Sequence, residues 1–392
     1  MRSEPTKKSV LIVVPFYVPA FRGGGPIRTI EGLTEEHQKK FDFFIFCSNH
    51  DLGQTDPLPV AKSEWTTRGP VQVFYADTST KRSFIRDITS LRRLDFDFLY
   101  LNSFFSFGFS TLPALLAKLG YIHTSHAIIA PRGEFGHAAL AISSTKKRVF
   151  LVITRLIQLH KGFVWHGSSD AEADEIRKLV PRGQVIVRQN ETSLPNKATI
   201  GKWSPEVDVV RFIYIGRLSP KKRIELALRA FADISTTCHL DIYGEFEDRA
   251  YEGTIRTIAN HLPDNVIVEF HGSLDHKAVR SKFAEADYFI FPTSHENFGH
   301  TIAESLSVGC PLLIQDVTPF SASVFEGNGI VVSDSSVQSW TRAIAAVISR
   351  TPAQHIAARN ATAAAYNKWR DRSRQDSVFE LAESLFADKE LK

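Results

Sequence analysis

The sequence predicts an α/β fold in which two parallel β-sheets are each covered by helices. Short apolar runs recur along the chain and alternate with stretches of helical periodicity, which is the pattern of repeated strand–helix–strand units. The polar, proline-containing stretch Gln189–Asp208 interrupts this alternation and is the best linker candidate. A chain of 392 residues is long enough to build two separate cores. We therefore expect one domain over residues 1–190 and a second over residues 205–360.

Each expected strand is a run of apolar residues bounded by polar or turn-forming residues. Helical periodicity begins at Ile27, covers Ile224–Ala232 and His300–Val308, and continues from Ser339 onward. The strands expected in the first domain are residues 10–14, 43–47, 71–75, 97–101, 126–130, 163–166 and 185–188. Those expected in the second domain are residues 209–215, 238–243, 266–270, 287–291, 311–314 and 329–332.

The first apolar run could also belong to a secretory signal peptide, because Lys7 and Lys8 precede it. It contains Pro15 and Pro19, however, and lacks a small-residue cleavage site, so we interpret it as the first strand. No run approaches the roughly 18 consecutive apolar residues of a transmembrane helix. These observations favour a cytoplasmic protein.

The composition is that of an ordinary globular protein, with 43% hydrophobic and 23% charged residues. A net charge of +4 is compatible with anionic nucleotide sugars or an anionic membrane, but it falls well short of a nucleic-acid-binding signature. Cys47, Cys238 and Cys310 lie in or beside strand-like segments without pair spacing. We expect three buried thiols in a reducing compartment, and neither a disulfide framework nor a zinc site.

Two carboxylates, Glu296 and Glu304, flank a predicted boundary between a strand and a helix. The apolar run Tyr288–Phe291 reads as a buried strand, and helical periodicity covers His300–Val308. Glu296 is therefore expected in the loop at the carboxyl end of the strand, and Glu304 inside the following helix. A helix with an acidic first turn and one solvated glutamate gives the same spacing, so the pair alone is weak evidence.

Between the two acids, the start of the expected helix presents backbone N–H groups, and the helix dipole favours a phosphate there. Carboxylates accept hydrogen bonds from sugar hydroxyls, so an acid on each side of a phosphate site suits a nucleotide sugar. The residues expected to line this part of a donor site are Phe298, Gly299, His300 and Thr301.

Two cations follow the apolar run Val209–Ile215, which reads as a fully buried strand. Arg217 and Lys222 lie in the next segment, directly before the helix expected at Ile224–Ala232. Cations at the exit of a strand stand at the edge where open α/β sheets bind ligands. Arginine can grip a pyrophosphate bidentately, and lysine supplies a movable point charge. A solvated basic turn is the alternative interpretation.

Together these motifs resemble those of the family-4 glycosyltransferases, retaining enzymes with the two-domain GT-B fold. In that family a Gly-Arg-Leu segment followed by Lys precedes a Glu-containing segment with the same seven-residue gap. The resemblance implies that Arg217 and Lys222 bind the donor pyrophosphate. It implies that Glu296 contacts the donor sugar and Glu304 the nucleotide ribose. It covers nearly the whole chain and is most specific over residues 209–316.

The resemblance implies two Rossmann-like domains that face a central cleft. Residues 1–190 would form the acceptor side, and residues 205–360 would bind the nucleotide sugar. A C-terminal helix at about 365–392 would pack back on the first domain, and Trp369 lies where the family's last helix usually crosses.

The first domain supplies further donor-site candidates by the same resemblance. A Gly-Gly loop after the first strand faces the donor phosphates in the family, and Gly24 and Gly25 fall at that position; a turn that merely reverses the chain is the alternative. A histidine near the carboxyl end of a later strand often faces the donor sugar. Either His126 or Arg132 matches that position. An arginine cannot act as a base at neutral pH, but it can orient hydroxyls or an anion.

The family's reaction is implied with these residues. A sugar would pass, with retention, from a UDP- or GDP-linked donor to a glycan or lipid-linked acceptor in bacterial surface polysaccharide synthesis, with no metal or other cofactor. Two alternatives stay open. One is another GT-B nucleotide-sugar enzyme, such as an epimerase. The other is a catalytically silent scaffold in a polysaccharide-assembly complex, since Arg223 stands where the family commonly has Gly after the lysine.

A basic, apolar segment at residues 146–161 bears on the acceptor. Lys146, Lys147 and Arg148 precede a strongly apolar body that includes Phe150. Basic amphipathic helices can lie on anionic membranes, so this segment predicts peripheral contact with the inner face of a membrane. A packed helix with a solvated basic edge is the alternative.

Overall fold

The computed structural model describes residues 7–136, 140, 144–201, 203, 209–373 and 376–390. The chain divides into two compact units. Unit 1 comprises Met1–Ser193 and Gln375–Lys392, and unit 2 comprises Leu194–Arg374. The first boundary between them falls inside the predicted linker, whose residues 202 and 204–208 lie outside the described part of the chain.

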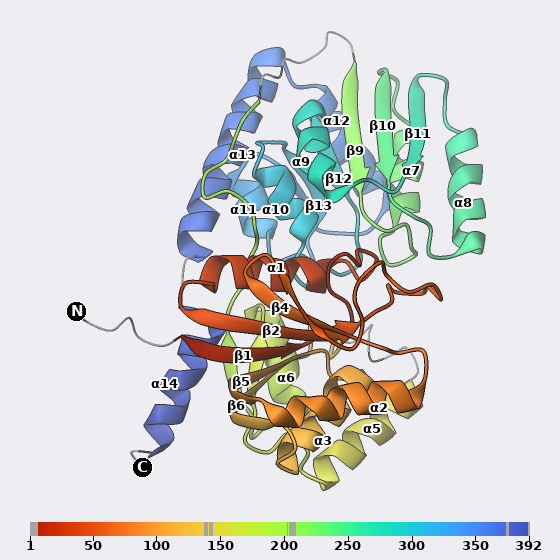
Figure 1. Ribbon diagram of the computed structural model, residues 1–392. Helices are drawn as coiled ribbons and strands as arrows, with labels where there is room; N and C mark the ends of the chain where they lie inside the picture. The colour runs from red at the N-terminus through yellow and green to blue at the C-terminus, as the bar shows by residue number, and fades with distance from the viewer. Residues whose placement is uncertain are drawn as a thin grey trace. The chain divides into compact units, whose positions relative to one another are not determined.

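Unit 1 is built on one sheet with the strand order β3-β4-β2-β1-β5-β6-β7-β8. Figure 1 shows several of these strands lying side by side, with helices packed against them. The strands are β1 (Lys8–Val13), β2 (Phe41–Ser48), β3 (Trp65–Arg68), β4 (Val71–Ala76), β5 (Asp95–Asn102), β6 (His123–Ala130), β7 (Val164–Gly167) and β8 (Gln184–Val187). The first apolar run is thus a strand.

The unit 1 sheet is parallel, as predicted, except at one edge. Strand β3 pairs antiparallel with β4 across a tight turn in which Gly69 has a φ of 59°. Trp65 anchors the strand, with its ring 5.4 Å from that of Phe74 and 5.5 Å from that of Phe44. The segment was missed because one aromatic residue among polar neighbours gives no apolar periodicity.

Helices cover both faces of the unit 1 sheet. Strand β1 is buried on both faces, since Val10 and Ile12 join one core while Leu11 and Val13 join the other. The first core is completed by α1 (Gly25–His37) and α14 (Val378–Glu390). The second is completed by α2 (Lys81–Ser90), a 3₁₀ turn (Leu91–Arg93), a π-helical turn (Phe107–Thr111), α3 (Leu112–Lys118), α5 (Ser144–Leu156) and α6 (Asp170–Leu179).

The chain returns from unit 2 to unit 1 later than the resemblance implied. The expected helix at about 365–392 is two helices, of which α13 (Pro352–Ser373) belongs to unit 2 and α14 to unit 1. Trp369 lies in the core of unit 2, with its ring 5.0 Å from that of Phe320. Ser377 then caps α14, because its hydroxyl accepts the N–H of Glu380 while the Glu380 carboxylate accepts the N–H of Ser377.

Unit 2 has an all-parallel sheet with the order β11-β10-β9-β12-β13-β14. Numbered from its first strand, this is the doubly wound order 3-2-1-4-5-6, in which the direction of winding reverses between β9 and β12. The strands are β9 (Val210–Ile215), β10 (Cys238–Tyr243), β11 (Val266–Gly272), β12 (Tyr288–Phe291), β13 (Leu312–Gln315) and β14 (Ile330–Val332). The remaining helices are α7 (Ile224–Phe231), α8 (Arg249–Asn260), α9 (His276–Glu285), α10 (His300–Leu306), α11 (Ser321–Glu326) and α12 (Val337–Ile348).

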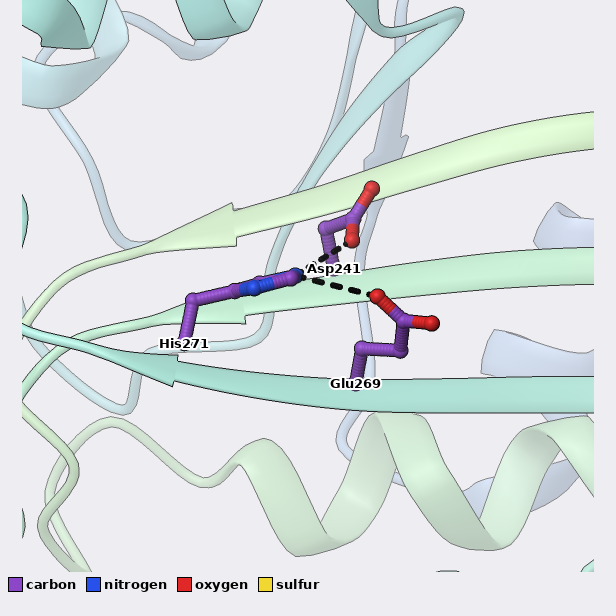
Figure 2. A group of neighbouring side chains, drawn as sticks. All are labelled: Asp241, Glu269 and His271. Atoms are coloured by element: carbon purple, nitrogen blue, oxygen red, sulfur yellow. Dashed lines mark hydrogen bonds and ion pairs between the residues drawn. The ribbon is translucent and has the colours of Figure 1, made fainter.

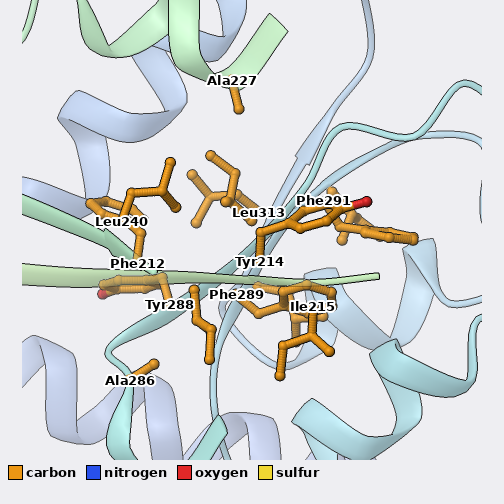
Figure 3. Close-up of a cluster of buried hydrophobic side chains, with 14 of the residues drawn as sticks. Phe212, Tyr214, Ile215, Ala227, Leu240, Ala286, Tyr288, Phe289, Phe291 and Leu313 are labelled. Atoms are coloured by element: carbon orange, nitrogen blue, oxygen red, sulfur yellow. The ribbon is translucent and has the colours of Figure 1, made fainter. Parts of the chain in front are cut away.

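The core of unit 2 fills both sides of its sheet. Figure 3 shows Ala227 of α7 on one side of the strands and Ala286 on the other. Aromatic rings dominate the centre, where the ring centroids of Phe212 and Tyr288 are 5.9 Å apart.

The predicted buried thiols are confirmed, since Cys47, Cys238 and Cys310 are free and buried. In the described part of the chain, no helix combines the length and apolar character needed to cross a bilayer.

Candidate active site

The candidate site in unit 2 lies at the carboxyl ends of β9 and β12, where the strand order reverses. The loops that leave these two strands diverge to opposite faces, which makes this edge the usual ligand-binding position of an open α/β sheet. The two loops are also tied together. The backbone N–H and the hydroxyl of Ser294, after β12, both donate to the carbonyl of Lys221, after β9, at 2.9 Å.

Lys222 and Glu296 form an ion pair at this position, with Nζ 2.7 Å from Oε2. Their side chains are only 15% and 18% exposed, and Lys222 Nζ also lies 4.7 Å from the centre of the Phe291 ring. Burial by itself raises the pKa of Glu296, but the charge and hydrogen bond of Lys222, the charge of Lys221 and the backbone N–H of Phe298 together hold that pKa below its usual value. Glu296 is therefore ionised at neutral pH.

Arg217 extends from the same loop into a more exposed position. Its guanidinium donates to the carboxylate of Glu247, and the two side chains are 57% and 42% exposed. The backbone of this loop is fixed, because the hydroxyl of buried Tyr214 donates to the Arg217 carbonyl at 2.9 Å. An exposed, singly paired guanidinium on a fixed loop can turn toward an incoming phosphate at little cost.

Gly299 and Glu304 shape the start of α10. Gly299 has a φ of 94°, and a Cβ there would lie 2.9 Å from Cδ1 of Ile302, so the loop requires glycine. Glu304 is buried on α10, with Oε1 3.5 Å from Nδ1 of His276, the first residue of α9.

The other residues predicted around Gly299 have different environments. The ring of Phe298 is buried, 5.5 Å from the Phe320 ring and 4.7 Å from that of His300, and so belongs to the core. Its backbone N–H instead donates a hydrogen bond to Glu296, which helps to lower the pKa of that acid. His300 and Thr301 are half-buried at the start of α10. A donor would therefore meet the backbone of Phe298 and not its ring.

Arg223 has a backbone conformation that explains why the resembling family commonly carries glycine there. Its φ of 55° lies in the left-handed region, where a side chain costs about 1 kcal/mol. The residue serves as the N-cap position of α7, and its guanidinium donates to the hydroxyl of Ser335 at 2.8 Å. Having arginine in place of glycine therefore costs some local conformational energy, but it leaves the Lys222–Glu296 ion pair intact.

The Gly-Gly loop of unit 1 follows β1 and starts α1. Gly24 has φ 68° and ψ −130°, a region that only glycine adopts readily, and Gly25 is the first residue of the helix. The preceding turn is held by the carboxylate of Asp51, which accepts the N–H groups of Phe21 and Arg22. Both glycines are partly exposed, and a Cβ added at Gly24 would meet no atom within 4 Å, so the loop can admit a ligand closely.

Arg132 lies directly after β6 and binds three neutral partners. Its guanidinium donates to the side-chain carbonyls of Asn102 and Asn190 and to the hydroxyl of Tyr100. Asn102 ends β5 and Asn190 follows β8, so one side chain links the carboxyl ends of three strands. No carboxylate is among these three partners, so the cation retains charge for a ligand.

His126 occupies a different place. It lies four residues before the end of β6, roughly 13 Å along the strand. Its ring is 5.4 Å from that of Phe98 and stacks at 4.2 Å on Phe386 of α14. Of the two sugar-facing candidates, Arg132 stands at the carboxyl edge of the sheet and His126 packs within unit 1.

Two acids, Glu134 and Glu172, support this edge of unit 1 through contacts that the sequence analysis did not predict. The Glu134 carboxylate accepts the Ser103 hydroxyl at 2.7 Å and two backbone N–H groups of the loop after β5. Glu172 accepts the N–H of Gly133 and the N–H and hydroxyl of Ser168. The Ser103–Glu134 and Gly133–Glu172 contacts join residues about 30 to 40 positions apart, so no local sequence pattern predicts them.

Residues 198–364, within unit 2, match the family model for glycosyl transferases group 1. A GDP-mannose:cellobiosyl-diphosphopolyprenol alpha-mannosyltransferase from Xanthomonas campestris is 26% identical over 255 residues, which are 64% of this chain and 65% of that protein. HepE from Anabaena, solved in complex with UDP and glucose, has a TM-score of 0.68 at 15% identity and covers 97% of this chain and 100% of its own. Sucrose-phosphate synthase from Thermosynechococcus elongatus has a TM-score of 0.70 at 17% identity, and the match covers 98% of this chain and 100% of that protein.

The family match falls on the unit that holds Lys222, Glu296 and Glu304, and the structural matches extend over almost the entire chain. The two doubly wound sheets agree with those matches. Residues 198–364 thus match the glycosyl transferases group 1, and the fold of the chain is GT-B.

Proposed function

We propose that the protein transfers a sugar, with retention, from a nucleotide sugar to a glycan or lipid-linked acceptor in surface polysaccharide synthesis. The observation that carries the proposal is the Lys222–Glu296 ion pair at the switch point of the unit 2 sheet. This pair places a cation that can bind the donor diphosphate beside a carboxylate that can bind the donor sugar. The Xanthomonas relative is named for GDP-mannose and HepE was solved with UDP, so the donor is GDP- or UDP-linked.

In the proposed reaction, the bond between the anomeric carbon and the donor phosphate oxygen breaks while the acceptor oxygen bonds to the same face of that carbon. The acceptor proton passes to the leaving phosphate. Lys222 and Arg217 balance the negative charge that grows on the diphosphate, in place of a metal ion. The carboxylate of Glu296 holds the sugar hydroxyls during this change.

The test is incubation of the protein with UDP- and GDP-linked sugars, with and without a polyprenyl-diphosphate-linked glycan. We expect one donor to yield a glycosylated acceptor whose anomeric configuration, read by NMR, equals that of the donor. Conversion of the donor sugar without transfer would instead identify an epimerase. No turnover of any donor, with nucleotide binding absent, would support the scaffold alternative.

The two glutamates are expected to affect different kinetic constants. Glu304→Gln should raise KM for the donor with little change in kcat, because a ribose contact is similar in the ground and transition states. Glu296→Gln should lower kcat about 100-fold, because the sugar changes charge and geometry during transfer and Lys222 loses its ionic partner. Steady-state kinetics with varied donor measure both effects.

The matched control is Glu247→Gln, which neutralises an acid on the same edge of unit 2 that pairs with Arg217. It should leave kcat within about 3-fold of the parent, since exposed pairs contribute little. A fall in kcat for Glu304→Gln together with a KM effect for Glu296→Gln would show that the two roles are exchanged.

A surface on unit 1 supports a membrane-associated acceptor. Along α5, Val149, Val152, Ile153 and Leu156 are 50–77% exposed and recur at helical spacing, so they form one outward apolar stripe. We call these four residues the α5 stripe. Lys146 and Arg148 are exposed at its start, and Arg155 near its end. An apolar stripe flanked by cations fits an anionic bilayer surface.

Two of the predicted membrane residues face inward instead. The ring of Phe150 packs on Phe104 at 5.4 Å, and Lys147 Nζ lies 5.0 Å from the centre of the Phe105 ring. The helix also ends at Leu156, and Gln158, beyond it, has a φ of 50°. The membrane contact therefore depends on the α5 stripe, Lys146 and Arg148.

Replacing both Lys146 and Arg148 with Gln is expected to weaken binding to anionic liposomes about 30-fold, at about 1 kcal/mol for each cation. Replacing Val152 and Leu156 with Gln should weaken it further and remove the residual binding at high salt. Liposome co-sedimentation measures both. Phe325→Gln is the control, because it removes an equally exposed apolar residue (75%) from unit 2. A parent protein that ignores anionic liposomes at low salt would leave a water-soluble acceptor as the proposal.

A further inference from the structure

A cluster outside the donor site gathers three side chains of metal-binding type. Asp241 lies on β10, and Glu269 and His271 lie on the neighbouring edge strand β11. Asp241 and Glu269 are directly opposite in the parallel register, so their side chains leave the same face of the sheet. Figure 2 shows the imidazole of His271 turned toward both carboxylates.

The ligand atoms are close enough to share one cation. Nε2 of His271 is 2.6 Å from Oδ1 of Asp241 and 3.6 Å from Oε2 of Glu269, and the three atoms lie within 4.8 Å of one another. A tetrahedral zinc ion with bonds of about 2.0–2.2 Å holds its ligands about 3.3 Å apart. The side chains therefore need to move by less than about 1 Å, which rotation of exposed carboxylates supplies.

The imidazole is held in this orientation before any metal binds. Its ring stacks on that of Tyr243, with centroids 4.5 Å apart and planes 17° from parallel. The register between β10 and β11 also shifts at this point, since Tyr243 pairs with Gly272 and His271 is left as the extra residue. Such bulges re-aim side chains, and here the bulge and the stacked ring both constrain Nε2.

The charge of the cluster also favours a cation. The two carboxylates face one imidazole, and Lys282 near Tyr243 is held by Glu285 at 2.8 Å. One nitrogen and two carboxylate oxygens suit zinc, whereas magnesium and calcium prefer sites made of oxygen alone.

We propose that Asp241, Glu269 and His271 form a zinc site on the edge of the unit 2 sheet, with solvent completing the tetrahedron. The site clamps β10 to β11 at the point where the chain leaves the sheet. Four residues after His271, Asp275 caps α9 by accepting the N–H of Lys277, and the next residue, His276, contacts Glu304. Zinc thus stiffens the connection that positions His276 against a residue of the candidate donor site, without taking part in transfer.

The test is titration of the tag-free, chelator-treated full-length protein with zinc chloride, by calorimetry and by competition with a chromophoric chelator. We expect one saturable site for each chain and a rise in Tm of about 5 °C at a 100-fold excess over the dissociation constant. His271→Ala should weaken binding at least about 10-fold, and Glu269→Gln should do so without changing side-chain volume.

His123→Ala is the matched control, because His123 forms a similar exposed pair with Asp95 at 2.8 Å across neighbouring strands of unit 1. It should bind zinc as the parent does. The proposal is overturned if the parent shows no saturable binding, or if His271→Ala and Glu269→Gln bind zinc as tightly as the parent. Magnesium chloride in place of zinc should give no rise in Tm.

Discussion

Lys222→Ala is expected to lower kcat for sugar transfer by at least about 100-fold, because removing one preorganised group from a developing charge typically costs about 2.7–4 kcal/mol. Lys222 is the better buried of the two proposed diphosphate cations, and its loss also leaves Glu296 without its ionic partner. Arg217→Ala should lower kcat to a similar extent, although its side chain is exposed in the free protein. Single-turnover kinetics with a saturating donor measure the step directly.

Lys368→Ala supplies the matched control for both variants. Lys368 is a cation in an exposed ion pair with Glu326, elsewhere in unit 2, so its removal tests the loss of one charge alone. It should retain kcat within about 2-fold. Near-normal turnover in Lys222→Ala with an intact fold would contradict the proposed diphosphate site.

Gly244→Ala is expected to have the largest effect on stability, with a loss of about 3 kcal/mol or more and a fall in Tm of at least about 6 °C. Gly244 follows β10 with a φ of 148°, and a Cβ there would overlap the backbone carbonyl oxygen of Gly216. Neither group is a flexible side chain, so the clash is relieved only by moving β10 away from the β9 loop. That loop carries Arg217, so transfer should fall as well.

Gly253→Ala is the matched control for Gly244→Ala in the thermal unfolding measurement. Gly253 lies within α8, and nothing lies within 4 Å of a Cβ added there. Alanine favours a helix over glycine by about 1 kcal/mol, so this variant should raise Tm slightly. Equal Tm values for the two variants would show that the Gly244–Gly216 approach does not limit stability.

The strands were predictable because burial on both faces makes them continuous apolar runs. Cys238–Tyr243 is predicted to the residue, and the other expected strands differ by a few residues at their ends. The short edge strand Trp65–Arg68 was not predicted, and the chain was predicted to return to unit 1 earlier than it does, at the helix that contains Trp369. Both depend on tertiary partners, a ring for Trp65 and the unit 2 core for Trp369, which local periodicity does not encode.

The candidate site was predictable where its residues follow strands directly. Lys222 lies seven residues after the end of β9 and Glu296 five residues after the end of β12, and the strand order places those ends side by side. The partners of Arg132 were out of reach, because Asn102, Tyr100 and Asn190 lie 30 to 58 positions away. The same holds for the zinc cluster, in which Asp241 and Glu269 meet only through the register of β10 and β11.

The return of α14 to unit 1 affects how the chain is made on the ribosome. Phe379 of α14 covers Phe41, Phe43 and Phe98, which are translated long before it. The roughly 180 residues of unit 2 are synthesised in between, which takes on the order of 10–40 s at about 5–20 residues per second. During that interval the aromatic face of the first sheet has α1 but lacks α14, so the core of unit 1 is completed only after unit 2 has been synthesised.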